Sequence, residues 1–202
     1  AWLSFNPATQ TFSGTPLNDD VGSLSIRVTA TDTSGASATQ DFQVTVNNTN
    51  DAPVASATIA GQSANEDAGL SFSVAPGSFT DVDAGDSLTY SASLADGSPL
   101  PAWLSFNPAT QTFSGTPLND DVGSLNVRVT ATDTAGASAA QDFTVTVNNT
   151  NDGPVASATI ADQSINEDAG FSFAVPASSF TDVDVRDSLT LSATLADGSP
   201  LP

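Results

Sequence analysis

Apolar residues alternate with small polar ones along most of the chain, which is the pattern of half-buried β-strands. In residues 123–133, for example, Leu125, Val127 and Val129 alternate with polar side chains. Turn-forming sequences recur about every 8–12 residues, as in β-sandwiches, and helix signals are nearly absent. In the middle of the chain the pattern predicts strands at residues 54–60, 70–74, 88–94, 103–106, 112–115, 123–133 and 138–148. We therefore expect an all-β protein built from seven-stranded Greek-key β-sandwiches.

The chain repeats itself with a period of 101 residues, the spacing from Trp2 to Trp103 (103 − 2 = 101). Residues 1–101 and 102–202 differ at only 17 positions. A period this long exceeds the roughly 20–50 residues of solenoid repeats and fits a string of autonomous domains. The sequences NNTNDAPV (47–54) and NNTNDGPV (148–155) each place a proline just past an apolar strand, where strand pairing ends. We call these two segments the first and the second junction.

These boundaries predict one complete module, residues 52–151. Residues 1–51 would be the C-terminal half of the module before it, and residues 152–202 the N-terminal half of the module after it. Because the chain opens within a module, we expect it to be a segment of a longer protein. Neither half can cover its sheet faces alone. We therefore expect them to pair with neighbouring modules or chains of the same protein, as a head-to-tail fibre or a swapped assembly, or to be cut from a longer polymer.

The chain is strongly acidic, with 23 acidic and 3 basic residues and a net charge of −20. This charge argues against nucleic acid or an anionic membrane as a partner and favours cations. No apolar run approaches the ~18 residues needed for membrane insertion. Cysteine and histidine are both absent, so thiolate and imidazole metal sites are excluded. The remaining oxygen ligands suit calcium or magnesium.

Acidic and amide side chains gather around each junction. At the first junction they lie in the turn 18–20, in the linker 47–54, in the loop 81–83 and at Asp133. In a row of sandwiches, the segment leaving one domain meets the loops at the top of the next, so these side chains should converge. Converging carboxylates repel one another, and the chain has few basic residues to offset them. A divalent cation would do so, and calcium takes six to eight oxygen ligands.

The order of these motifs resembles that of cadherin repeats, in particular the bacterial cadherin-like and dystroglycan-type domains, grouped with the Ig-like repeats of large surface adhesins. NTNDAPV (48–54) resembles the cadherin linker, and TDVDAGDSLTY (80–90) resembles the cadherin DxD loop. The turn 17–20, the segment 30–32 and Glu66 resemble three further cadherin motifs. The resemblance covers the whole period and implies a cadherin/Ig-like sandwich with Ca2+ between modules.

The resemblance also implies the calcium ligands. For the first junction they are Asn18, Asp20, Asn48, Asn50, Asp51, Asp81, Asp83 and Asp133. For the second they are Glu66, Asn119, Asp121, Asn149, Asn151, Asp152, Asp182 and Asp184. The first linker aspartate of cadherins is an asparagine here, at Asn48 and Asn149, which predicts weaker binding or fewer ions. The same acidic turns could instead be hydrogen-bonding turns of an acid-rich surface.

An EF-hand is a weaker interpretation of the loop that begins at Asp81. Its pattern Asp81-x-Asp83-x-Gly85-Asp86 has the glycine in the wrong place, and no bidentate glutamate follows. We therefore assign the loop to the junction.

The resemblance implies a structural role: a stalk, an extender or a filament segment of a secreted or cell-surface, extracellular protein. The alternative is a carbohydrate-binding or homophilic adhesion module, with a polysaccharide or a cell surface as partner. Trp2, Trp103 and Tyr90 are the only Trp or Tyr residues, and the alternation around the tryptophans predicts core or half-buried positions rather than a sugar-stacking platform. Enzymatic activity is not expected, because the chain lacks His, Cys and Lys and its carboxylate pairs recur in every module.

Overall fold

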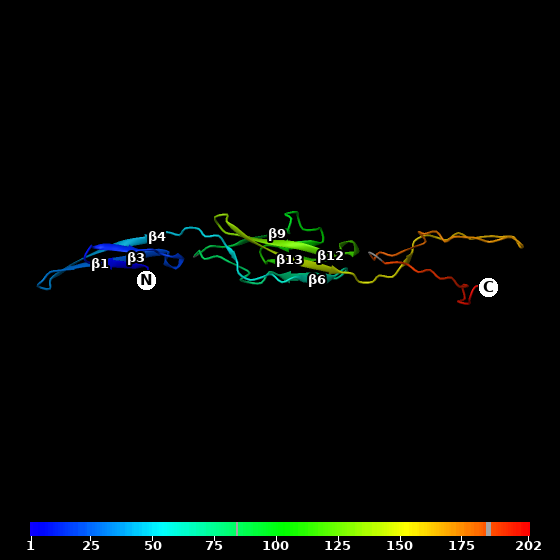
Figure 1. The fold of residues 1–202 in the computed structure, drawn as a ribbon, viewed down its shortest axis with the longest axis horizontal. Helices are drawn as coiled ribbons and strands as arrows, with labels where there is room; N and C mark the ends of the chain where they lie inside the picture. The colour runs from blue at the N-terminus through cyan, green and yellow to red at the C-terminus, as the bar shows by residue number, and fades with distance from the viewer. Residues whose placement is uncertain (84, 185–186) are drawn as a thin grey trace.

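The molecule is a row of β-structure with one central sandwich between two half-modules (Figure 1). The computed structural model describes residues 1–83, 85–184 and 187–202. We call residues 52–151 the central module, residues 1–51 the N-terminal half-module and residues 152–202 the C-terminal half-module. The two half-modules lie at opposite ends of the row. Among the described residues, no helix is long and apolar enough to cross a lipid bilayer.

Two sheets face each other in the central module. One has the strand order β6-β13-β12-β9, the other β10-β11-β7, and β5 forms a separate pair with β8. The only parallel pair among these described strands joins β13 to β6. The strands are β5 (Val54–Ala55), β6 (Gln62–Asn65), β7 (Leu70–Ser73), β8 (Phe79–Thr80), β9 (Thr89–Leu94), β10 (Leu104–Asn107), β11 (Thr112–Gly115), β12 (Gly123–Thr132) and β13 (Ser138–Asn148). The predicted all-β sandwich is confirmed.

The core lies between the two sheets and is built by the alternating residues of their strands. Val127, Val129 and Ala131 on β12 are fully buried, and Phe113 on β11 is 0% exposed. The Phe113 ring stacks on Phe72 with a centroid distance of 4.9 Å and meets the edges of other core rings. Aromatic pairs at such distances add to the stabilisation from burial. The period-2 pattern therefore places the apolar face of each long strand inward.

The first predicted strand, residues 54–60, is wrong in its extent. The structure ends β5 at Ala55 and begins β6 at Gln62, a strand that the sequence pattern did not predict. Between them the side chain of Gln141 replaces a strand partner: its Nε2 donates to the carbonyl of Ala57 (2.7 Å), and its Oε1 accepts the N–H of Ile59 (3.0 Å). The chain can thus cross from the β5–β8 pair to the four-stranded sheet with its backbone groups satisfied.

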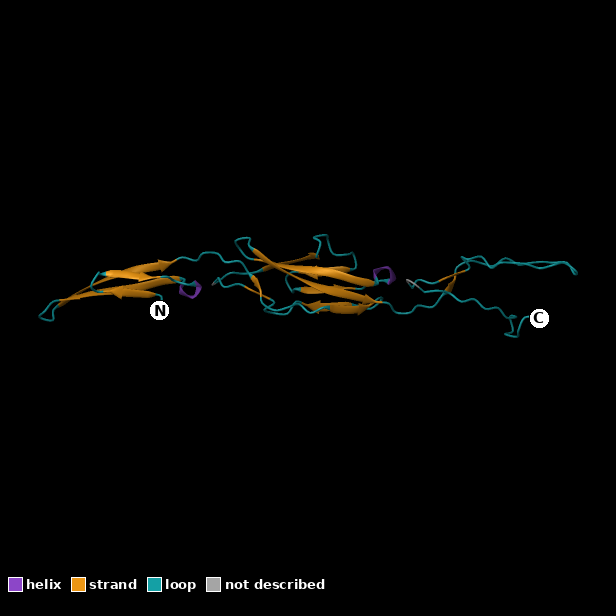
Figure 2. Ribbon diagram, viewed as in Figure 1, coloured by secondary structure: helices purple, strands orange, loops and turns teal. Residues whose placement is uncertain are grey.

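In each half-module, the described strands pair only with other strands of the same half-module. The N-terminal half-module has β1 (Leu3–Asn6), β2 (Thr11–Gly14), β3 (Gly22–Thr31) and β4 (Ser37–Val46). In the described part of the C-terminal half-module, only β14 (Val155–Ala156) and β15 (Phe180–Thr181) are strands. Two short 3-10 helices, η1 (Asn18–Asp20) and η2 (Asn119–Asp121), lie on the sides that face the two junctions (Figure 2).

Candidate metal centre at the module junctions

At the first junction, three carboxylates point toward one another at the end of the central module that faces the N-terminal half-module. Asp81 follows β8, Asp86 lies in the loop before β9, and Asp133 follows β12. One carboxylate oxygen from each lies within 4.8 Å of the others. The Oδ2 atoms of Asp81 and Asp86 are buried and have no hydrogen-bond partner. Buried polar atoms are normally paired, so this cluster offers free oxygen atoms at a desolvated position.

The linker of the first junction is tied to this cluster by hydrogen bonds. Asn50 donates from Nδ2 to Asp133 Oδ2 (2.9 Å), and the backbone N–H of Asp51 donates to Asp83 Oδ2 (2.8 Å). Asn18, from the N-terminal half-module, donates from Nδ2 to Asp51 Oδ2 (2.6 Å). The first junction therefore joins side chains from one module, the linker and the next module.

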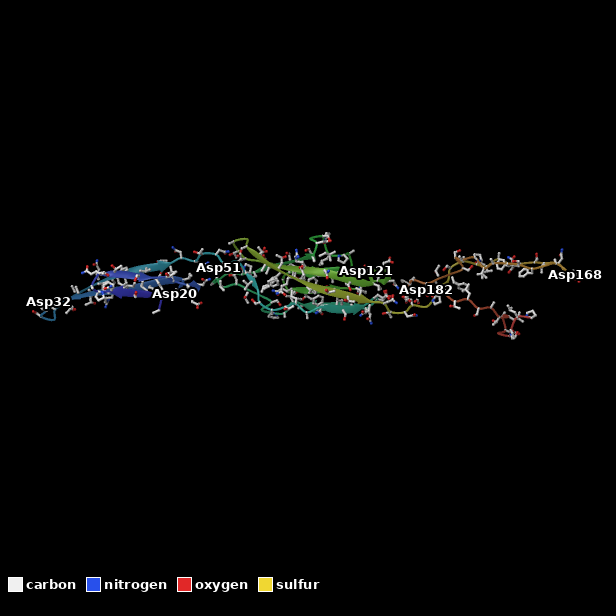
Figure 3. The ribbon with its side chains drawn as sticks, viewed as in Figure 1. Asp20, Asp32, Asp51, Asp121, Asp168 and Asp182 are labelled. Atoms are coloured by element: carbon white, nitrogen blue, oxygen red, sulfur yellow. The ribbon has the colours of Figure 1, made fainter. Side chains whose placement is uncertain are left out.

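At the second junction, a cluster spans both modules and the linker. Glu66 follows β6 in the central module, Asp152 lies in the linker, and Asp184 lies in the C-terminal half-module. One carboxylate oxygen from each lies within 4.8 Å of the others. Glu66 is only 2% exposed. Figure 3 places Asp121 and Asp182 at this junction, and Asp20 and Asp51 at the first.

Two carboxylates of this second cluster accept a backbone N–H with one oxygen and leave the other oxygen without a partner. Glu66 Oε1 accepts the N–H of Thr150 (2.6 Å), whereas its Oε2 is buried without a partner. Asp184 Oδ2 accepts the N–H of Asp152 (2.8 Å), whereas its Oδ1 is buried without a partner. Asp83 at the first junction has the same arrangement. Each of these side chains holds the linker with one oxygen and leaves the other free.

The DxD loop supplies one more carboxylate than the resemblance implied. Asp86 belongs to the first cluster, and its counterpart Asp187 forms a group with Asp182 and Asp184 at the second junction. The hydroxyl of Thr134 donates a hydrogen bond to Asp86, which holds it at the end of β12. The spacing Asp-x-Asp-x-x-Asp was the available sequence signal. The DxD motif of the resemblance covers Asp81 and Asp83 and does not extend to Asp86.

Other predicted ligands form hydrogen bonds within their own turns or with the linker. Asp20 and Asp121 each accept a backbone N–H, from Leu17 and Leu118, at 2.9 Å and so close the helices η1 and η2. Asn119 donates to Asp152 Oδ2 (2.7 Å), and the side chain of Asn151 donates to the Asp152 carbonyl (2.9 Å). The remaining two, Asn48 and Asn149, are exposed linker residues.

Among the residues that the structure describes, the arginine side chains are paired elsewhere than in these clusters. Arg27 pairs with Asp41 and Arg128 with Asp142, each at 2.7 Å, across neighbouring strands of the sheets. These are the only ion pairs within the described residues, and the third arginine, Arg186, lies outside them. All donors in the clusters are oxygens, which select hard cations such as Ca2+ and Mg2+. The unpaired buried oxygens and this donor set fit a divalent cation.

Hydrogen bonding lowers the pKa of Asp133 below its ordinary value. The largest cause is the bond from Asn50, and the backbone N–H groups of the following loop add to it, because they favour the charged form. A depressed folded-state pKa stabilises the fold above the ordinary value of about 3.9, and this stabilisation is lost as the pH falls through the folded-state pKa.

This shift predicts how the junction responds to acid. With chelator present, Asn50→Ala should lower the melting temperature at pH 7, because the Asp133 carboxylate loses its donor. The difference from the parent chain should shrink as the pH falls below about 4, because Asp133 is then protonated first in folded Asn50→Ala and, at lower pH, in the folded parent. Thermal unfolding at pH 7, 5 and 3 measures this, and a carboxyl carbon NMR titration should show the Asp133 pKa rising in Asn50→Ala. A difference independent of pH would contradict the assignment.

The tryptophan and tyrosine side chains form no exposed platform. Trp103 and Tyr90 are half-buried and pack against the hydrophobic core, and Trp2 is also half-buried. The expectation of half-buried tryptophans is confirmed. A sugar-binding surface built from stacked tryptophan or tyrosine rings therefore has no counterpart in Trp2, Tyr90 and Trp103.

Two facing sheets in the central module, a sequence that repeats every 101 residues and acidic clusters where the repeats meet define a tandem cadherin-like, Ig-like β-sandwich. The chain belongs to the family described as Putative Ig domain, whose model matches residues 1–47 and 52–148. No curated protein matches the sequence significantly.

Solved structures show the same fold. The chain is similar to domains EC1-2 of human mucin-like protocadherin, with a TM-score of 0.55, 16% identity and coverage of 74% of this chain and 79% of that one. It is similar to domains 1-5 of protocadherin gamma B2, with a TM-score of 0.52, 16% identity and coverage of 78% and 33%. It also aligns with an endo-fucoidan hydrolase of glycoside hydrolase family 107, with a TM-score of 0.42, 23% identity and coverage of 74%. The chain spans only 22% of that hydrolase chain.

Proposed function

We propose that this chain is a segment of an extracellular, adhesin-like protein in which Ca2+ at each junction stiffens a row of modules. The observation that carries the proposal is the second cluster. Glu66, Asp152 and Asp184 come from one module, the linker and the next module, and their carboxylate oxygens lie within 4.8 Å of one another. Two of their oxygens are buried without a partner. An ion held there would contact both modules at once.

The chain's own residues prepare this site. Glu66 and Asp184 each fix the linker through a backbone N–H, so the linker is positioned before any ion binds. Asn119 holds the side chain of Asp152 toward the same gap. A bound divalent cation supplies the positive charge that offsets the repulsion among the carboxylates. Without it, like charges this close together favour separation of the modules.

The proposed role is structural and non-enzymatic. Repeated modules linked in a row extend a distal domain away from a surface, and their stiffness depends on the angle held at each junction. The clusters recur at successive junctions rather than at a single cleft, which supports a role in architecture. The mixed amide and carboxylate donors favour calcium over magnesium, because calcium accepts more oxygen ligands in looser geometry.

Chelation should soften the molecule and destabilise it. In the parent chain, an excess of EDTA should reduce the maximum dimension measured by small-angle X-ray scattering. It should also lower the melting temperature. Calcium at 100 times its dissociation constant should stabilise the folded chain by about 2.7 kcal/mol through linkage. Isothermal titration calorimetry with CaCl2 gives the dissociation constant, and MgCl2 serves as the matched control. If calcium produces no binding heat and EDTA changes neither quantity, the proposal is wrong.

A further inference from the structure

We propose that the Asp152–Gly153 pair in the second junction is a site of spontaneous aspartate isomerisation. The modification would reroute the main chain of the linker through the Asp152 side chain, with water as the only co-reactant. Three observations point to this site: the sequence of the Asp-Gly pairs, the hydrogen bonds of their glycine N–H groups, and the difference between the two junctions.

The reaction needs an aspartate that is followed by an accessible backbone N–H. The nitrogen of Gly153 attacks Cγ of Asp152, and the new N–Cγ bond closes a succinimide ring. The displaced carboxylate oxygen leaves as water with the Gly153 N–H proton and a proton from solvent. Water then attacks the main-chain carbonyl carbon of Asp152 and breaks its bond to the glycine nitrogen. The product is isoaspartate with a free α-carboxylate, and its mass equals that of the starting chain.

Three Asp-Gly pairs make the chain open to this chemistry, at Asp96, Asp152 and Asp197. Glycine is well suited to the attack because it has no Cβ to crowd the ring and has the widest choice of backbone angles. Asp96 and Asp197 are equivalents 101 residues apart and lie in the same turn of the repeat, whereas Asp152 lies in a linker. The surroundings of each pair therefore decide which one reacts.

The two pairs in turns are protected by hydrogen bonds. The N–H of Gly97 donates to the carbonyl of Leu94 at 2.9 Å, and the equivalent bond of Gly198 has the same length. The Oδ1 atom of Asp96 accepts both the N–H (2.9 Å) and the hydroxyl (2.6 Å) of Ser98. The attacking nitrogen and the attacked carboxylate are thus both engaged, so the turn must open before the ring can form.

The glycine of the second junction is not held in this way. In the part of the chain that the structure describes, the N–H of Gly153 donates no hydrogen bond. Gly153 is exposed, and beyond its chain neighbours no atom lies within 4 Å of the position that a Cβ would take. Asn119 donates to Asp152 Oδ2 (2.7 Å) and so restrains the carboxylate, but it leaves the glycine nitrogen free.

The first junction differs from the second by a single methyl group in the same linker sequence. Its pair is Asp51–Ala52, and Ala52 is also exposed, with no hydrogen bond from its N–H among the described residues. The position is thus open both before and after the complete central module, whichever half-module adjoins it. The Cβ of Ala52 crowds the ring, and Pro53 restricts the alanine backbone further. We therefore expect Gly153 to react faster than Ala52.

Isomerisation would alter the geometry of the second cluster. A carboxylate oxygen of Asp152 lies within 4.8 Å of oxygens of Glu66 and Asp184. In isoaspartate the main chain gains a methylene group and the carboxylate is attached directly to Cα, so the carboxylate moves relative to its two neighbours. The second junction should then bind calcium more weakly as the protein ages. This consequence rests on the proposed function, whereas the isomerisation itself does not.

Peptide mapping of the aged full-length chain tests the site. The only basic residues are Arg27, Arg128 and Arg186, so trypsin places Asp152 in residues 129–186, separate from the other Asp-Gly pairs. Isoaspartate peptides separate by chromatography at unchanged mass, and electron-transfer fragmentation locates the residue. After incubation at neutral pH in EDTA, isoaspartate at Asp152 should form at least about fivefold faster than at Asp51, Asp96 or Asp197. In concentrated urea, which removes the turn hydrogen bonds, the three Asp-Gly pairs should react at similar rates.

A reciprocal exchange between the junctions provides matched variants. Gly153→Ala gives the second linker the sequence of the first and should abolish most of the isomerisation at Asp152. Ala52→Gly makes the opposite change and should bring the rate at Asp51 close to that at Asp152 in the parent. Each new residue already occupies the equivalent place in the other junction, so both variants should fold.

Three results would overturn the assignment of this site. The first is a folded chain without isoaspartate at Asp152. The second is faster reaction at Asp96 or Asp197, because a free glycine N–H would then not select the site. The third is an equal rate at Asp152 in the parent and in Gly153→Ala.

Calcium separates this inference from the proposed function. Saturating CaCl2 should slow the reaction at Asp152 at least about threefold and leave Asp96 unchanged, because a cation bound to the Asp152 carboxylate would hold it away from the glycine nitrogen. Calorimetry on aged parent chain should also show weaker calcium binding than on aged Gly153→Ala. Calcium binding without either effect would overturn the link between isomerisation and the cluster. A fresh chain that binds no calcium but forms isoaspartate at Asp152 would overturn the proposed function and leave the site.

Discussion

Replacing Phe113 with alanine is expected to lower the free energy of unfolding of the central module by about 3–5 kcal/mol. The ring is fully buried, stacks on Phe72 and meets Phe143 and Phe106 at centroid distances of 5.6 and 4.6 Å. Its removal would leave a cavity between the two sheets, and the surrounding side chains could fill this cavity only in part.

The matched control for this change is Leu118→Ala. Leu118 is a large apolar residue of the same module, but its side chain is exposed beside η2. It should cost less than about 0.5 kcal/mol, as surface substitutions usually do. Urea unfolding followed by tryptophan fluorescence measures both, since Trp103 packs against the same core. Equal effects of the two substitutions would show that the ring of Phe113 does not lie in the core.

Most of the sheet architecture could be predicted from the sequence because long strands carry a strong period-2 signal. Apolar and polar residues alternate along all of β12 and along β13 from Asp142 onward, and both strands were predicted to within one residue. The segment between Ala55 and Gln62 could not be predicted in this way. Its backbone is satisfied by the side chain of Gln141, more than 80 residues further along the chain. Local pattern contains no information about such a partner.

The candidate site was predictable to the level of which loops meet, but not to the level of individual oxygens. The motif order brings the DxD loop, the linker and Glu66 to the junctions, and the clusters there contain Glu66, Asp81, Asp133, Asp152, Asp182 and Asp184. Sequence spacing does not show that the Asp121 carboxylate accepts the N–H of Leu118, or that the Asp86 carboxylate lies beside that of Asp81. Those outcomes depend on turn geometry and on contacts with the neighbouring strand.

Replacing Glu66 with glutamine is expected to have opposite effects with and without calcium. The change keeps an oxygen for the N–H of Thr150 but removes one of three negative charges within 4.8 Å. At an effective dielectric constant near 20, each pair of like charges at this separation costs about 3 kcal/mol. In EDTA, Glu66→Gln should therefore be more stable than the parent, by about 2 kcal/mol after partial screening.

In calcium the order should reverse. The variant loses one charged ligand at the second junction, so its calcium affinity should fall at least tenfold, equivalent to about 1.4 kcal/mol. Melting temperatures of both chains in EDTA and in saturating calcium measure the crossing. Asp120→Asn is the control: it removes one charge from the exposed end of η2 near the same junction, and its curves should not cross those of the parent. A Glu66→Gln chain that is less stable in both conditions would indicate a purely structural glutamate, and the account of a cation between the modules would then fail.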